Sequence, residues 1–170
     1  MLKDFDLVNG SERREDVSKA EIILCWPTTL GGIVEFTGPN LKVIQPFSAG
    51  VDDLPYDKIP ESVQIFSNAG AYSQSVAEHA LALVLALSKN VGRKDPPESY
   101  EIARKTIVIL GAGEIGSTVA KMMWDGFTCR TVGISRSFKH PENFDEVLSP
   151  SHLDDALGAA DILICALPLN

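Results

Sequence analysis

The sequence has no segment that resembles a membrane span or a secretion signal. Its longest apolar run, residues 80–87, lies between His79 and Lys89 and is far shorter than the roughly 20 residues that cross a bilayer. Residues 1–16 contain neither an apolar core nor a small-residue cleavage site. We therefore expect a cytoplasmic protein that does not associate with a membrane.

Cysteine is scarce as well. Cys25, Cys129 and Cys165 are odd in number and far apart, and none has a histidine at metal-ligand spacing. These positions predict buried free thiols and argue against a disulfide framework or a zinc site. Free thiols fit a reducing cytoplasm.

Positive charge is in the minority. Lys and Arg number 15 and Asp and Glu number 23, which gives a net charge of −8. Such a surface is poorly suited to neutralise a phosphate backbone, so a nucleic acid is not expected as a partner. The 45% hydrophobic and 22% charged residues are ordinary for a globular protein, and 170 residues suffice for one domain or two small ones.

Short apolar runs bounded by turn-forming residues occur in the first part of the chain. Residues 20–26, 41–45 and 62–66 are rich in β-branched side chains and are predicted to be strands. The residues that bound these runs are Gly, Pro, Asn or Ser, which commonly end strands.

An apolar helix is predicted over residues 75–90. Ser75 and Glu78 have the spacing of a capping box, in which each side chain bonds the other's backbone amide. The body of the helix is apolar nearly all round, which is typical of a helix buried between two domains or two subunits. Two adjacent prolines then exclude a helix, and we place a domain boundary within residues 89–99.

The rest of the chain alternates strands and helices. One helix is expected to end at Gly126, and another is predicted over residues 151–160 with Ser151 as its cap. This order indicates an α/β fold with a doubly wound parallel sheet, apparently incomplete because it stops one strand past the crossover. The strands are predicted at residues 105–110, 130–134 and 161–167.

A glycine motif connects the first of these strands to the helix that follows it. Gly111, Gly113 and Gly116 have the spacing G-x-G-x-x-G, with a buried strand before them and an amphipathic helix after them. The first glycine permits a tight turn, the second lets the backbone approach a pyrophosphate, and the third lets helix and strand pack closely. The free amides of the helix N-terminus face the phosphates, so we predict dinucleotide binding.

The segment after the second strand bears on the choice of cofactor. An NAD-binding domain usually has Asp or Glu about 20 residues beyond the glycines, where it bonds the ribose 2′-hydroxyl. Here that segment holds Ser135, Arg136, Ser137 and Lys139, and no acid. Two positive charges and two hydroxyls would attract a 2′-phosphate, so we expect NADP to be preferred over NAD.

Four segments together resemble the D-isomer-specific 2-hydroxyacid dehydrogenases, particularly the shorter archaeal-type members. The segments are SAGVDD (48–53), the stretch 67–90 with SVAEH, KTIVILGAGEIGSTVA (105–120) and ICALPLN (164–170). The resemblance implies a flavodoxin-like substrate domain over residues 1–92, with 75–90 as its inter-domain helix. It also implies a Rossmann-type cofactor domain over 100–170, truncated relative to the family.

The resemblance further implies roles for individual residues. Backbone amides of Ala49, Gly50 and Val51 would hold the substrate carboxylate, as a glycine-containing turn can. The cofactor would be bound by Val76, Gly111, Gly113, Glu114, Ile115, Gly116, Ser135, Arg136, Ser137, Lys139, Ala166, Leu167 and Pro168. The family's catalytic Arg, Glu and His all lie beyond the position of Asn170, and His79, His140 and His152 match none of them.

The expected activity is hydride transfer between NAD(P)H and a small 2-oxo acid or D-2-hydroxy acid of the glyoxylate, hydroxypyruvate or glycerate class. The sequence would then be part of a longer chain, which forms a homodimer if it follows the family. One alternative is a dinucleotide-sensing module without chemistry, and a weaker one is a formate dehydrogenase.

Overall fold

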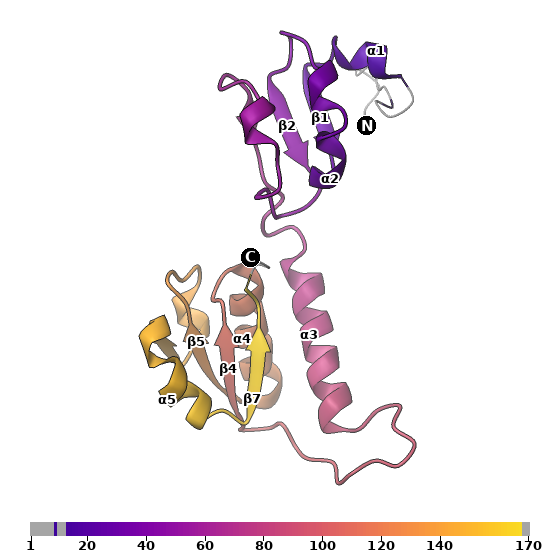
Figure 1. The fold of residues 1–170 in the computed structure, drawn as a ribbon. Helices are drawn as coiled ribbons and strands as arrows, with labels where there is room; N and C mark the ends of the chain where they lie inside the picture. The colour runs from indigo at the N-terminus through magenta and orange to yellow at the C-terminus, as the bar shows by residue number, and fades with distance from the viewer. Residues whose placement is uncertain (1–8, 10–12, 168–170) are drawn as a thin grey trace. The chain divides into compact units, whose positions relative to one another are not determined.

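The computed structural model describes residue 9 and residues 13–167, and the chain divides into two compact units (Figure 1). Unit 1 extends to Ala69 and unit 2 begins at Gly70. We expected the boundary within residues 89–99, but the division falls about 20 residues earlier.

The position of the division follows from the packing of helix α3 (Ser73–Ser88). This helix packs along helix α4 (Glu114–Phe127) of unit 2, with Ala77 and Val84 buried in the core that α4 shares. The two adjacent prolines therefore lie in a loop inside unit 2 rather than between the units.

Unit 1 is built on a three-stranded parallel sheet with the order β1-β2-β3. Ile23 and Ile44 point into a buried cluster, whereas Ile22 and Leu24 are half exposed, so the described part of the chain covers one face of this sheet. The elements are α1 (Arg14–Val17), β1 (Ile22–Cys25), α2 (Pro27–Leu30), β2 (Val43–Pro46) and β3 (Gln64–Ile65), with 3-10 turns at Val34–Phe36 and Tyr56–Lys58.

Unit 2 contains a four-stranded parallel sheet with the order β6-β5-β4-β7. The chain runs outward from β4 through β5 to β6 and then returns to the other side of β4. This change of direction is the topological switch point of a doubly wound sheet. Its strands are β4 (Thr106–Leu110), β5 (Arg130–Ile134), β6 (Glu146–Leu148) and β7 (Ile162–Cys165). The α/β prediction with parallel strands is confirmed, although β6 was not predicted.

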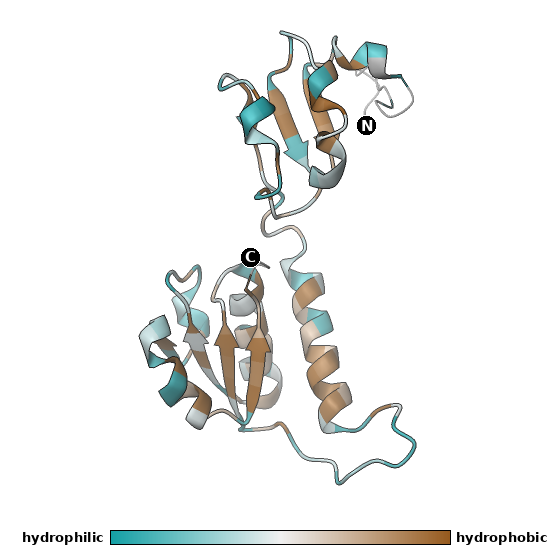
Figure 2. Ribbon diagram, viewed as in Figure 1, coloured by the Kyte–Doolittle hydropathy of each residue, from teal (hydrophilic) through white to brown (hydrophobic). Residues whose placement is uncertain are grey.

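Helices cover both faces of this sheet, which explains the uninterrupted apolar sequence of β4 (Figure 2). Ile107 and Ile109 pack in one cluster with α3 and α4. Val108 packs on the other face with Ala156 of α5 (Leu153–Gly158). A strand buried on both faces has no solvent side on which polar residues would alternate.

Three predicted helix ends are wrong. Ser75 lies inside α3, so it cannot be a cap, and Gln74 donates a 2.8 Å hydrogen bond to Glu78 instead. Gly126 lies inside α4, which ends on Thr128 in the left-handed region with a φ of 50°. Ser151 lies in a 3-10 turn (Pro150–His152) before α5 and forms no capping bond with that helix.

The cysteines are free thiols, but they differ in exposure. Cys25 and Cys129 are buried, as predicted, and burial raises the pKa of both thiols. Cys165 is exposed at the end of β7, so its predicted burial is wrong. Among the described strands, β7 pairs with β4 alone, so it lies at an edge of the sheet.

Within residues 13–167, no helix combines the length and the apolar character needed to cross a bilayer.

Candidate functional site

The glycine turn of unit 2 lies between β4 and α4, at the carboxyl ends of the strands. Gly111 has a φ of +94°, and a Cβ placed on it would lie 2.6 Å from the carbonyl oxygen of Ala166. A Cβ on Gly116 would collide with the carbonyl oxygen of Gly111. Both positions therefore require glycine for reasons internal to the fold.

Gly113 differs from the other two glycines. Its φ of −78° is open to any residue, and a Cβ on it would meet no atom within 4 Å. Gly113 precedes the first turn of α4, whose leading amides have no partners within the helix. This space next to free amides is what a pyrophosphate needs, so the turn fits a dinucleotide.

Backbone hydrogen bonds hold the neighbouring loops against this turn. The Gly111 amide donates to the Ile134 carbonyl at 2.9 Å, and the Lys139 amide donates to the Ala112 carbonyl at 3.1 Å. On the other side, the Ala166 amide donates to Leu110 at 2.8 Å. The loops after β4, β5 and β7 therefore meet at the switch point, where ligands of such sheets bind.

The loop after β5 carries the residues predicted to choose the cofactor. The side chains of Arg136 and Lys139 are exposed and form no ion pair with any described residue. Ser135 accepts a 3.4 Å hydrogen bond from the Ser137 amide. The loop thus presents two cations to solvent beside the glycine turn.

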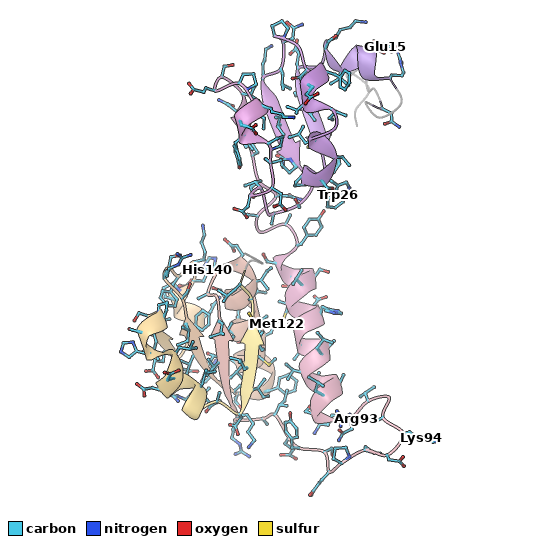
Figure 3. The ribbon with its side chains drawn as sticks, in the orientation of Figure 1. Glu15, Trp26, Arg93, Lys94, Met122 and His140 are labelled. Carbon is cyan, nitrogen blue, oxygen red and sulfur yellow. The ribbon has the colours of Figure 1, made fainter. Side chains whose placement is uncertain are left out.

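His140, labelled in Figure 3, lies at the end of the same loop, and its ring nitrogens contact two carboxylates. Its Nε2 is 3.5 Å from Glu114 at the start of α4, and its Nδ1 is 3.2 Å from Glu142. The pKa of Glu142 is lowered, mainly by its own backbone amide and also by His140. Sequence reasoning did not find this contact, because 26 positions separate Glu114 from His140.

The remaining predicted cofactor residues also lie in unit 2. Ile115 is half-buried in the first turn of α4, and Val76 is exposed in α3. Ala166 and Leu167 follow β7. Pro168 lies outside the described residues.

In unit 1, the loop after β2 contains the predicted carboxylate-binding residues Ala49, Gly50 and Val51. Their backbone amides donate no hydrogen bond to any residue of the described chain. Their carbonyls, in contrast, all accept bonds, as do those of Phe47 and Ser48. The donors are Ser67 to Ala49 at 2.8 Å, Ser48 to Gly50 at 2.9 Å, Tyr56 to Val51 at 3.1 Å, and Asn68 to Phe47 at 2.8 Å and to Ser48 at 3.2 Å.

This loop borders a cavity of about 310 Å³ at the carboxyl ends of β1 and β2. Trp26, labelled in Figure 3, follows β1. Its ring packs against that of Phe47 after β2, with the ring centroids 5.6 Å apart. Sequence reasoning missed the contribution of the β1 loop, although its position directly after a buried strand was a usable signal. The cavity is lined by Trp26, Pro27, Thr28, Ser48, Gly50, Asp52 and Asp53.

No group of three or more His, Cys, Asp or Glu side chains in the described part of the chain is arranged to hold a metal ion. Nδ1 of His152 forms hydrogen bonds with its neighbours Ser149 and Ser151, and His79 is exposed on α3.

Comparison with known proteins places residues 66–170 in the family described as "D-isomer specific 2-hydroxyacid dehydrogenase, NAD binding domain". A glyoxylate reductase of Pyrococcus furiosus is 25% identical over 78% of this chain and 45% of its own length. A D-3-phosphoglycerate dehydrogenase of Mycobacterium leprae is 27% identical over 95% of this chain and 33% of its own.

A solved structure, described as a glycerate dehydrogenase related protein from Thermoplasma acidophilum, is 39% identical. It aligns with a TM-score of 0.59 over 79% of this chain and 50% of its own. The chain thus spans half or less of the length of each of these three proteins.

Proposed function

Since this chain belongs to the D-isomer specific 2-hydroxyacid dehydrogenase family, we propose that the complete protein transfers a hydride between NAD(P)H and a small 2-oxo acid or D-2-hydroxy acid. The acid would be of the glyoxylate, hydroxypyruvate or glycerate class, which the name of the Pyrococcus relative supports. The observation that carries the proposal is the glycine turn. Gly111 and Gly116 are required by the fold, whereas the open side of Gly113 serves no internal contact.

A bound nicotinamide dinucleotide would supply or accept the hydride. Unit 2 would hold its pyrophosphate against the open side of Gly113 and the leading amides of α4, whose positive dipole end favours an anion. Unit 1 would hold the substrate carboxylate on the amides of Ala49, Gly50 and Val51, which have no partners in the described chain. The family's Arg, Glu and His would follow Asn170, with the His as general acid for reduction.

We further propose that NADP is preferred over NAD. Arg136 follows β5 where an NAD-binding domain usually has a carboxylate, and Lys139 comes three residues later. Both side chains are exposed, and neither is paired with a described acid. Glu114 at the start of α4 and Glu142, two residues after His140, are both paired with His140. A guanidinium can make charge-assisted bonds to phosphate oxygens and can stack on adenine.

We also propose that the complete protein is a homodimer in the cytoplasm. The apolar side chains of Val76, Leu83 and Leu87 are exposed along α3, which supports an interface at this helix. Three free cysteines support a reducing compartment.

Turnover by the complete protein tests the proposal. Purified protein should oxidise NADPH in the presence of glyoxylate or hydroxypyruvate, and the His152→Ala variant should keep this activity. Binding of NADPH without turnover of any 2-oxo acid would contradict the enzyme and favour the dinucleotide-sensing module. No binding of either dinucleotide would contradict both.

A further inference from the structure

The cavity of unit 1 has a charge pattern that bears on which acid could enter it. Asp52 and Asp53 line the cavity, are exposed, and form no ion pair with any described residue. Among the described residues, no cationic side chain lines it. The free amides beside it can satisfy one anionic group of a substrate, but a second anionic group would face two carboxylates.

The cationic side chains that the structure describes elsewhere in unit 1 lie outside the cavity lining. Each cationic side chain that the structure describes in this unit already has a carboxylate partner within 3.0 Å. The pairs are Arg13–Asp16, Lys19–Asp16, Lys42–Glu21 and Lys58–Glu35. A phosphate group needs such charges, preferably an arginine fork, to replace its hydration.

The cavity offers an aromatic surface in place of cations. Trp26 is 53% exposed although it packs against Phe47, so one part of the indole faces the cavity that Trp26 lines. A half-exposed indole gains free energy when an uncharged group covers it. The hydroxyl of Thr28, also in the lining, can bond a neutral polar substituent.

We infer that this cavity receives the substituent on C2 of the substrate and selects 2-oxo acids whose substituent is uncharged, rejecting those that carry a phosphate. The inference rests on the proposed function and assigns its choice of acid to the side chains that line this cavity. The substrate preference would then match the name of the glyoxylate reductase and differ from that of the D-3-phosphoglycerate dehydrogenase.

The matched pair of substrates for the test is hydroxypyruvate and 3-phosphohydroxypyruvate, which differ only in the phosphate. With the complete protein and NADPH, kcat/KM should favour hydroxypyruvate at least about tenfold, because the phosphate loses the charge-assisted bonds it has in water. Equal rates, or a preference for the phosphorylated acid, would overturn the inference and leave the proposed function standing. Absence of turnover with every 2-oxo acid would overturn both.

Three variants locate the effect. Asp53→Lys should raise the kcat/KM ratio of phosphorylated to free acid at least about tenfold. Glu61→Lys makes the same change of charge at an exposed site outside the cavity, and it should leave that ratio within about twofold. Trp26→Ala should lower kcat/KM more for 2-oxobutyrate than for glyoxylate, which has no carbon substituent, and Trp26→Phe should restore part of the difference. An equal response of both lysine variants, or of both substrates to Trp26→Ala, would overturn the assignment.

Discussion

Replacing Gly113 by alanine should separate ligand binding from folding. The new Cβ would meet no atom within 4 Å, and the φ of −78° is favourable for alanine. Loss of glycine reduces the entropy of the unfolded chain, worth about 0.4–1 kcal/mol, while alanine is a poorer helix cap by a similar amount. The two effects nearly cancel, so the free energy of unfolding should stay within about 1 kcal/mol of the wild type.

The same methyl group would occupy the space in which a pyrophosphate has to approach the backbone. Forcing a methyl into a closely packed contact costs about 1–3 kcal/mol. That range corresponds to a Kd for NADPH weaker by about 5- to 150-fold. Nothing in the ligand-free fold opposes the substitution, so the loss should appear in binding alone.

Gly116→Ala is the matched control. It adds the same methyl three positions away, but there the Cβ would collide with the carbonyl oxygen of Gly111 and the backbone has to move. This variant should lose stability by about 1–3 kcal/mol as well as affinity.

Urea unfolding and fluorescence titration of NADPH, on the complete protein and both variants, give the two quantities. Wild-type affinity in Gly113→Ala would refute the assignment of the pyrophosphate to this turn. An equal loss of stability in both variants would refute the steric argument.

Three further substitutions test other parts of the proposal. Arg136→Asp should weaken NADPH binding about 10- to 100-fold and leave NADH unchanged or improved; an equal effect in Arg93→Asp, an exposed arginine of the loop after α3, would contradict this. Gly50→Ala should raise KM for the 2-oxo acid at least about fivefold with little loss of stability, because its Cβ meets no protein atom within 4 Å yet Gly50 lines the cavity; an unchanged KM would count against carboxylate binding there. Asp161→Asn should lower the urea midpoint at pH 7, because the Thr106 amide, at 2.9 Å, and Lys105 hold the pKa of the Asp161 carboxyl below its usual value. A lowered pKa stabilises the fold above the unfolded-state pKa of about 3.9, and this stabilisation is lost as pH falls through the folded value. A difference between the proteins that does not shrink as pH falls below about 3.9 would contradict the prediction.

The strands that were predicted well are those whose residue pattern is compatible with few other structures. Residues 130–134 form β5 with the predicted bounds, because a buried β-branched run next to a turn has few alternatives. The strand β6 (Glu146–Leu148) was missed because it is three residues long and its sequence, Glu-Val-Leu, carries no alternation to detect. Its pairing with β5 comes from the crossover, which single-sequence patterns do not reveal.

The helix α3 shows a different limit. Its apolar sequence correctly predicted a helix, but a helix that is apolar nearly all round does not specify its partner. Contact with α4 decides that it belongs to unit 2, and that contact depends on Ala77 and Val84 facing a helix 30 or more positions away. The predicted capping box was wrong because the helix begins at Ser73, two residues before Ser75, the serine with capping-box spacing.

For the candidate site, the spacing of Gly111, Gly113 and Gly116 predicted a dinucleotide turn, but only coordinates distinguish the two glycines required by the fold from the one that is not. The ion pairs between cations and carboxylates of unit 1 could not be predicted from the sequence either. Lys58 and Glu35 lie 23 positions apart, and no local pattern joins them.

Hydrogen bonds hold the carbonyls of the loop after β2 in place. This rigidity affects the rate at which the loop binds an anion. Ser67 and Asn68 hold it from the adjoining segment after β3, so its conformational freedom is already lost when unit 1 folds. A carboxylate arriving there would find amides that need no rearrangement, and little ordering entropy would oppose binding. Ser67→Ala would release one carbonyl and loosen the loop without removing any donor that faces the anion. We therefore expect this variant to bind the carboxylate more slowly through the same amides. That result would show that residues outside the contact with the ligand keep the loop in its binding conformation.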